Sequence, residues 1–288
     1  MNAEHTPQAG QPAARTRGQI WFEALAGQSA QDAPVLSASA ELGGARAQFI
    51  AVVPDARQRF PRAVDNVVGL EQGWRLAQTV RAVMAADELA DPSADPHVKV
   101  RRPIVALVDV KSQAYGRREE MLGLHLACAA AVDAYASARL AGHPVLALIV
   151  GPAMSGAFLA HGYQANRILA LDAPGTMVHA MGKEAAARVT RRSVEALDAL
   201  GETVIPMAYS MQAFEQLGLL HRLIRGIDAD APSAAQIETV RAALAAAVID
   251  ARSTPADLSS RLDSPQARKN RAASLEVRRR LALQWAAD

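Results

Sequence analysis

Residues 144–161, PVLALIVGPAMSGAFLAH, contain the strongest indication of the fold of this 288-residue chain. The continuous apolar run from Val145 to Val150 is typical of a strand that is buried on both faces of a parallel sheet. We expect this strand to stop at Gly151-Pro152 and a helix to begin at about Gly156. A helix in that position points free backbone N–H groups at whatever lies above the sheet edge. The stretch therefore predicts a backbone site for an anion or an oxyanion.

A second buried strand is predicted at residues 103–110, PIVALVDV, and it leads into the turn Ala114-Tyr115-Gly116. The first strand leads into the turn Ser155-Gly156-Ala157. Neighbouring parallel strands place such turns at the same carboxyl edge, where ligands bind in α/β folds. One N–H group from each turn would then point at a single oxygen. The two glycines also fit a simpler role, which is to allow tight turns.

The rest of the pattern predicts an α/β fold with a mostly parallel sheet, because strand-like and helix-like segments alternate along the chain. Gly43-Gly44 joins two further strand-like runs and indicates a hairpin. Residues 1–17 are expected to form a flexible polar arm, and residues 18–288 a single domain that is helical from about residue 183 onward. The other expected segments are strands at 35–40, 45–53, 166–171 and 176–180, and helices at 18–26, 69–89, 116–140 and from Ser264-Pro265 onward.

The composition favours a folded protein without disulfides. Half of the residues are hydrophobic, and the formal net charge of +2 is too small to indicate a nucleic-acid partner. The single cysteine, Cys128, excludes an internal disulfide and a multi-cysteine metal site, and its apolar neighbours indicate inert helix packing. The N-terminal residues lack the apolar core of a signal peptide, and no run reaches the roughly 18 apolar residues that span a bilayer. We therefore expect a cytoplasmic protein.

Charged residues and histidines add few candidates. Arg117 and Arg118 fall in the first turn of a predicted helix, where the macrodipole disfavours cations. They indicate either an anionic ligand or partner, or a solvated face, and the basic residues 278–280 allow the same two interpretations. The absence of a P-loop, of Gly-x-Gly-x-x-Gly and of paired carboxylates gives no support to cofactor-driven redox or phosphoryl chemistry. Three histidines are interpreted as structural because they lack metal-ligand spacing: His143, His161 and His221.

Ser155 and His179 both follow predicted strands, so a serine–histidine hydrolase is conceivable, since nucleophile and base need only meet in space. Ser155 does not lie in a G-x-S-x-G motif, because positions 153 and 157 are both alanine. His179 also fits a structural role, in which its ring nitrogens are hydrogen-bonded in the core or at an interface.

The two turn regions together resemble the carboxyltransferase branch of the crotonase-like (ClpP/crotonase) superfamily. Within it they look most like the gamma subunits of biotin-independent malonate decarboxylases. The resemblance covers roughly residues 15–285 and implies a spiral of β-β-α units with surrounding helices. The segments that carry it are PIVALVDV with YGRREE downstream at 115–120, residues 144–160, GQIWFEALAG at 18–27 and GLEQGWR at 69–75.

The resemblance also implies a complex. In that family the gamma subunit pairs with a homologous beta subunit, and the active site lies between the two. The substrate is a malonyl thioester on an acyl carrier protein subunit, whose prosthetic group is phosphoribosyl-dephospho-CoA. The products are the acetyl-carrier protein and CO₂, and neither biotin nor a metal takes part. This chain is accordingly expected to bind no cofactor of its own. Its small net charge and the lack of a long apolar run predict no nucleic-acid partner and no membrane.

The implied chemistry suits the two turns, because decarboxylation moves negative charge onto the thioester oxygen as an enolate. The expected catalytic residues are Gly116 and Gly156, as N–H donors, with Ala157 beside them. The superfamily often has Gly-Gly where this chain has Ser155-Gly156. Tyr115 and His179 are candidates for protonating the enolate, and the partner subunit is another source of that proton. The expected substrate-binding residues are Tyr115, Arg117, Met154, Ser155 and His179.

Two alternatives stay open. Ser155 and His179 also resemble the catalytic pair of Clp-type serine peptidases, which are crotonase-like as well. The sequence offers no convincing third member for such a peptidase, and Glu202 is the nearest acid in the segment where one would lie. The other alternative is a catalytically silent, structural half of a carboxyltransferase heterodimer.

Overall fold

The computed structural model describes residues 15–28, 33–90 and 100–286. The predicted N-terminal arm therefore lies outside the described residues except for its last three positions. There Thr16 caps the first helix, α1 (Arg17–Ala26). The Thr16 hydroxyl accepts from the Gln19 N–H, and the Gln19 side chain accepts from the Thr16 N–H at 2.9 Å, which is a capping box. The organisation of residues 18–288 as one domain stays a prediction.

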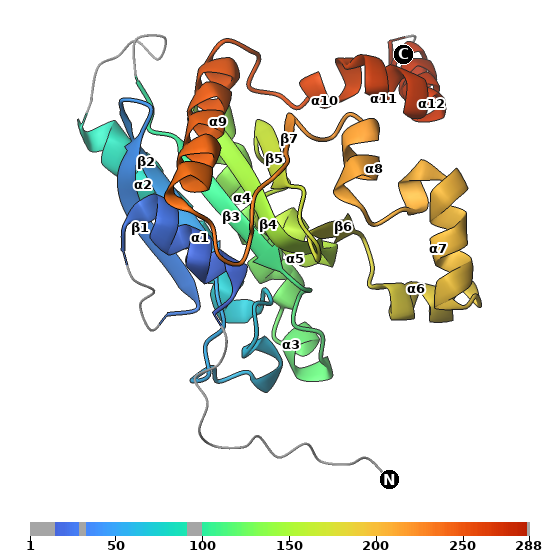
Figure 1. Cartoon of the computed structure of the whole chain (residues 1–288), viewed down its shortest axis with the longest axis horizontal. Helices are drawn as coiled ribbons and strands as arrows, with labels where there is room; N and C mark the ends of the chain where they lie inside the picture. Colours follow the sequence, from blue (N-terminus) through green and yellow to red (C-terminus); the bar gives the residue numbers. More distant parts are fainter. Residues whose placement is uncertain (1–14, 29–32, 91–99, 287–288) are drawn as a thin grey trace.

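A seven-stranded sheet forms the centre of the described structure, and it is mostly parallel, as predicted (Figure 1). The strand order is β1-β2-β3-β4-β5-β7, and β6 pairs with β4. Strands β1 and β2 form the expected antiparallel hairpin, with positive φ at Gly43 and Gly44 in its turn. The strands are β1 (Val35–Leu42), β2 (Ala45–Val52), β3 (Ile104–Val110), β4 (Val145–Met154), β5 (Arg167–Leu171), β6 (Met177–His179) and β7 (Arg222–Ile224).

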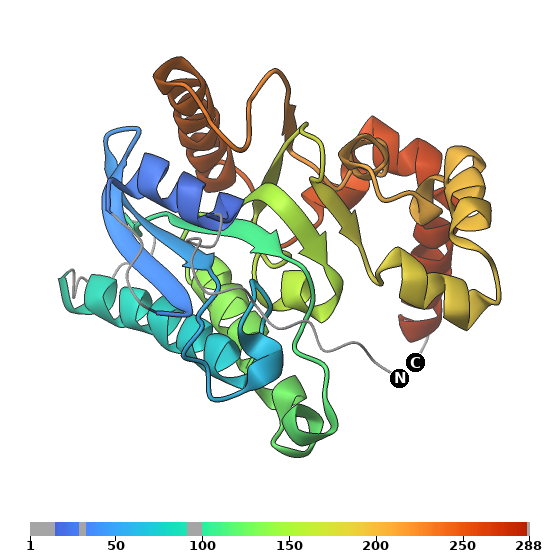
Figure 2. The ribbon, with the colours of Figure 1, turned by 60° about the horizontal axis from the view of Figure 1, so that its bottom comes forward.

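Helices cover both faces of the sheet, which explains the continuous apolar runs of its central strands (Figure 2). One face carries α2 (Leu70–Ala90) and α4 (Leu124–Leu140), and the other carries α1 and α9 (Ala234–Arg252). Along β3, Ile104 and Ala106 belong to the first core, whereas Val105 and Leu107 belong to the second. Successive side chains of a strand point to opposite faces, so a strand between two helix layers is apolar at every position.

The chain after β6 is mostly helical, but the prediction that it is entirely helical is wrong. Strand β7 pairs in parallel with β5. Its three residues are too few to show an alternating pattern, so only the pairing identifies it. Besides α9, the helical elements in this part are α6 (Lys183–Thr190), α7 (Val194–Thr203), the 3₁₀ turn η2 (Ile205–Met207), α8 (Met211–Gln216), α10 (Ser260–Asp263), α11 (Pro265–Asn270) and α12 (Ala272–Trp285).

Three predicted boundaries also differ from the structure. Strand β4 does not stop at Gly151-Pro152 but continues to Met154, because its last residues gain a new partner in β6. The helix predicted over 116–140 is two helices, α3 (Arg117–Met121) and α4, since Gly123 between them has φ +88°. The helix predicted from Ser264-Pro265 onward is also two, because the backbone leaves the helical region at Arg271 between α11 and α12.

Candidate functional site

The turn that follows β3 and the start of helix α5 (Ser155–Ala160), which follows β4 directly, lie side by side at the carboxyl edge of the sheet. The predicted turn Ser155-Gly156-Ala157 is therefore wrong, because these residues form the first turn of α5. The two strands pair in parallel from Ile104↔Val145 to Val110↔Ala153, so the chain leaves both at the same level. The backbone N–H of Gly156, in α5 (Ser155–Ala160), donates a 2.9 Å hydrogen bond to Oε1 of Gln113 in the β3–α3 segment. This bond links the two turns that the sequence singles out.

Gln113 is a residue that sequence reasoning missed. It lies three positions before Gly116, and its carboxamide rests on Gly156: a Cβ added to Gly156 would lie 3.2 Å from Cδ and Oε1 of Gln113. The only sequence signal is a carboxamide side chain directly before the turn Ala114-Tyr115-Gly116. A single turn does not reveal that such a side chain reaches across to the other turn.

Gly116 is closely enclosed by side chains. Its φ of 179° is extended backbone that any residue adopts, so its conformation does not require glycine. A Cβ at this position would instead overlap Oε2 of the buried Glu119 and lie 2.8 Å from Cδ of Arg62. Its neighbours Tyr115 and Arg117 are exposed. Close packing therefore explains the glycine, and any substitution at Gly116 would disturb Glu119 and Arg62 as well as the backbone donor.

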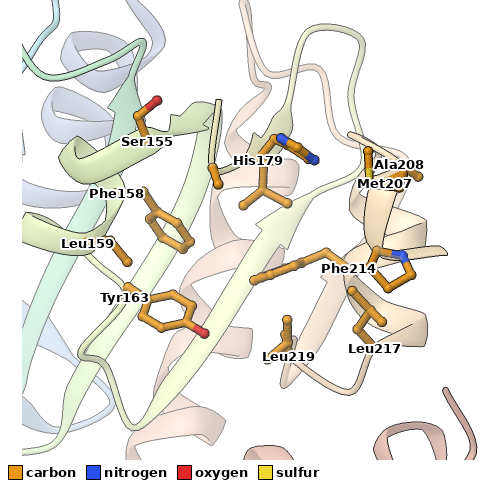
Figure 3. Close-up of a pocket in the computed structure, with 13 residues that line it drawn as sticks. Ser155, Phe158, Leu159, Tyr163, His179, Met207, Ala208, Phe214, Leu217 and Leu219 are labelled. Atoms are coloured by element: carbon orange, nitrogen blue, oxygen red, sulfur yellow. The ribbon is translucent and has the colours of Figure 1, made fainter. Parts of the chain in front are cut away.

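Ser155 opens α5 with φ +58°, which is the left-handed region that side chains other than glycine rarely adopt. Such conformations cost about 1 kcal/mol or more and concentrate at functional sites. His179 lies one register position away, because it pairs with Met154 across β4 and β6. The structure nevertheless gives no hydrogen bond between the Ser155 hydroxyl and the His179 ring, and Figure 3 shows the two side chains pointing in different directions.

The His179 ring is held by its own loop. It stacks on Tyr209 with ring centroids 4.0 Å apart, and its Nδ1 lies 3.1 Å from the carbonyl oxygen and 3.3 Å from the amide nitrogen of Met181. Burial lowers the pKa of His179, so the ring is neutral at neutral pH. Among the described residues no carboxylate is hydrogen-bonded to His179, and Glu202 is exposed on α7. The structure therefore does not bring Glu202, the nearest acid, to the histidine as a peptidase would require.

A cavity of about 440 Å³ lies beside Ser155 and His179, between α5, β6, η2 and α8 (Figure 3). Its lining is predominantly apolar and contains neither lysine nor arginine. A group that enters it loses contact with water, and hydrogen bonds made at its edge are stronger for that reason. The lining side chains are those of Ser155, Phe158, Leu159, Tyr163, Val178, His179, Ala180, Pro206, Met207, Ala208, Phe214, Leu217 and Leu219.

Two of the predicted site residues are largely enclosed by protein. Ala157 is fully buried in the core between the sheet and the α2–α4 layer, and Met154 is nearly so. Ala157 lies in the first turn of α5, where backbone N–H groups have no acceptor within the helix. Ala157 and Met154 can therefore contact a ligand through their backbone groups and not through their side chains.

A family model described as "Malonate decarboxylase gamma subunit" matches residues 63–285, which is well over half of the chain. The chain belongs to the malonate decarboxylase gamma subunit family. The resemblance inferred from the two turns is thus confirmed. Malonate decarboxylases are carboxyl-transferring, decarboxylating enzymes, and membership identifies the chain as a subunit of this class.

Relatives of this gamma-subunit chain agree with the family. It is 51% identical to a chain in the crystal structure of a Pseudomonas malonate decarboxylase hetero-tetramer in complex with coenzyme A. That match covers 93% of this chain and 99% of that one, with a TM-score of 0.85. It is also 36% identical over 172 residues to the malonyl-S-ACP:biotin-protein carboxyltransferase MADD of Malonomonas rubra. This second match covers 59% of the chain and 57% of MADD, so the chain spans little more than half of that relative's length.

The fold of this gamma-subunit chain is crotonase-like, as predicted. It matches transcarboxylase 12S, a crotonase-fold carboxyltransferase, with a TM-score of 0.55 and 18% identity, over 77% of this chain and 36% of that one. At this identity the match concerns the fold alone.

His161 and Cys128 have structural surroundings. His161 is fully buried, with Nδ1 3.0 Å from the Tyr135 hydroxyl and Nε2 3.0 Å from the Leu107 carbonyl oxygen, and burial lowers its pKa to about 4. Cys128 packs partly buried against the core beneath α4, as predicted, and burial raises the pKa of its thiol to about 11. Within the described parts of the chain, no group of three or more metal-ligating side chains is placed to hold a metal. Nor does any helix there combine the length and apolar character needed to cross a bilayer.

Proposed function

We propose that this chain is a catalytic subunit of a malonyl-S-acyl-carrier-protein decarboxylase, which converts the malonyl thioester to the acetyl thioester and CO₂. The observation that carries the proposal is the Gly156 N–H, which points across the carboxyl edge of the sheet at the β3–α3 turn. Cleavage of the bond between the α-carbon and the carboxylate leaves its electron pair on the thioester as an enolate. A donor fixed where the enolate oxygen forms stabilises the transition state more than the substrate.

The roles of the site residues follow from their places. Gly156 is the principal donor, and Gly116 and Ala157 supply further N–H groups from the two turns. Ser155 and His179 lie at the apolar cavity, which keeps water away from the enolate. Met154 and Tyr115 flank the two donors. Protonation of the α-carbon completes the reaction, and Tyr115, His179 and the partner subunit are its candidate sources. Because the His179 ring is neutral, it would act as a relay that takes up one proton from water or from the partner as it gives up another.

We infer that the chain acts in a hetero-oligomer with a homologous beta subunit and receives its substrate from an acyl carrier protein. Two findings on relatives support this inference: the Pseudomonas relative is a hetero-tetramer crystallised with coenzyme A, and MADD is named for malonyl-S-ACP. Coenzyme A and the proposed phosphoribosyl-dephospho-CoA prosthetic group share the pantetheine thiol. Unlike MADD, this chain would release the carboxyl group as CO₂ without passing it to biotin.

Co-purification from the native source tests this proposal. We expect mass spectrometry to find a carboxyltransferase-like partner and an acyl carrier protein with the tagged chain. The complex should release CO₂ from malonyl-S-carrier protein, and excess avidin should not inhibit it. A complex that transfers the carboxyl group to a biotin protein, or that lacks a carrier protein, would contradict the proposal.

Replacing Ser155 with alanine separates the decarboxylase from a serine peptidase. Loss of a nucleophilic serine costs roughly a million-fold in kcat, whereas the proposed decarboxylase needs no nucleophile, so we expect Ser155→Ala to lower kcat less than about tenfold. Malonyl-S-carrier protein turnover by the purified complex gives this value. A fluorophosphonate probe should leave the wild-type chain unlabelled, and labelling at Ser155 would restore the peptidase interpretation.

Charge reversal at Arg117 tests carrier-protein recruitment. Arg117 is exposed next to Gly116, so a negatively charged carrier approaching the donors would pass it. We expect Arg117→Glu to raise KM for the carrier substrate about twofold to tenfold, with little change in kcat and a weaker dependence of KM on salt. The matched change Arg46→Glu, at an exposed arginine on β2, shows whether the effect belongs to the site or to the overall charge. An unchanged KM for Arg117→Glu would mean that Arg117 is part of a solvated face and does not recruit the carrier protein.

A further inference from the structure

The acceptor of the Gly156 N–H is the side-chain carbonyl of Gln113, at 2.9 Å. The backbone that carries this side chain is fixed on both sides. Gln113 forms a β-bridge with Val68, the Ala114 N–H donates to the Val68 carbonyl at 2.9 Å, and the Val68 N–H donates to the Ser112 carbonyl at 3.0 Å. Movement of the acceptor therefore has to come from rotation of the Gln113 side chain alone.

A carboxamide oxygen and a thioester oxygen are chemically similar acceptors, since each is the oxygen of a planar carbonyl group. One N–H group makes one well-aligned hydrogen bond, so both oxygens cannot hold Gly156 at full strength together. A thioester oxygen that binds Gly156 must displace the Gln113 oxygen. The enolate oxygen carries charge and forms a stronger hydrogen bond than the neutral carboxamide, so the exchange favours the transition state.

We propose that Gln113 is an internal competitor of the substrate, a positioning residue that holds the Gly156 donor and yields it to the thioester oxygen. Its side chain keeps the donor paired and aligned, and its acceptor strength sets the apparent affinity of the site for the thioester. The inference rests on the proposed function, because it takes Gly156 as the donor to the substrate oxygen.

A series of variants at Gln113 tests this competition in the intact complex. Gln113→Leu removes the acceptor, and we expect it to raise kcat/KM for malonyl-S-carrier protein about threefold to tenfold, which is the net strength of one hydrogen bond. Gln113→Glu supplies a charged and stronger acceptor, and we expect it to lower kcat/KM at least about tenfold. The same substitutions at Gln78, exposed on α2, control for the change of side chain and should leave kcat/KM as in the wild type.

Binding gives a second readout that does not depend on turnover. Calorimetric titration with acetyl-coenzyme A should rank the affinities as Gln113→Leu above wild type and wild type above Gln113→Glu. A fall in kcat/KM for Gln113→Leu, or equal affinities across the series, would overturn the competition. An inactive wild-type complex would instead count against the proposed function, while the binding series would still report on Gln113.

Discussion

Replacing Gly156 with valine is expected to lower decarboxylation at least about 100-fold, because one preorganised donor contributes roughly 10²–10³ in rate. The two methyl groups of valine would fill the space in front of the backbone N–H, where a Cβ alone already lies 3.2 Å from the Gln113 carboxamide. The φ of Gly156 is not in the left-handed region, so the substitution blocks the donor without straining the backbone. Turnover of malonyl-S-carrier protein by the assembled complex measures the effect.

Two further variants show whether this loss is specific. Gly156→Ala adds only the Cβ, which the flexible end of Gln113 can accommodate, so its loss should be smaller than that of valine. Gly182→Val is a matched glycine change at the start of α6, where the nearest atom to an added Cβ is 3.9 Å away, and it should retain activity. Full activity of Gly156→Val in a complex of normal composition would support the alternative in which this chain is a catalytically silent, structural half of a heterodimer.

Truncating Trp21 is expected to cause the largest loss of stability. The side chain is fully buried in the core beneath α1, and its Nε1 donates a 3.0 Å hydrogen bond to the carbonyl oxygen of Ala229. Trp21→Ala removes that packing and leaves the Ala229 carbonyl buried without its donor. We expect it to lower the free energy of unfolding by about 3–5 kcal/mol, measured by urea denaturation of the isolated chain.

Trp285 offers the matched control, since it is the same residue type with 78% of its surface exposed on α12. We expect Trp285→Ala to change the free energy of unfolding by less than about 0.5 kcal/mol. Equal small effects at both tryptophans would mean that α1 does not pack on the sheet as described. The two variants together test whether α1 packs against the sheet. Phe22, which follows Trp21 in α1, is buried in the same core.

Much of the fold is predictable because its strongest signals are local. The apolar runs of β3 and β4 are strands buried on both faces, and the Gly43-Gly44 turn specifies its hairpin through positive φ values. The errors concern features that depend on a partner. Strand β7 is three residues long and exists through its pairing with β5, and β4 continues through Pro152 because β6 pairs with its end.

The candidate site divides in the same way. Sequence patterns alone place Gly116 and Gly156 directly after neighbouring parallel strands, and parallel pairing brings both positions to one edge of the sheet. The predicted turn at Gly156 is the first turn of α5 instead. The contacts between side chains of these two segments cannot be predicted from the residues of either segment alone. The separation of Ser155 from His179 and the hydrogen bond from Gly156 to Gln113 depend on rotamers and loop packing.

By itself, the sequence determined the class of fold, the two segments that follow the central strands and the family, because the signals for buried strands and for these segments lie in consecutive residues. Only the tertiary structure decided what faces the Gly156 donor. Its acceptor, Gln113, lies 43 positions away along the chain and reaches Gly156 because β3 and β4 are neighbours in the sheet. Hydrogen bonds of this kind depend on distances in space, which the order of residues along a chain does not specify.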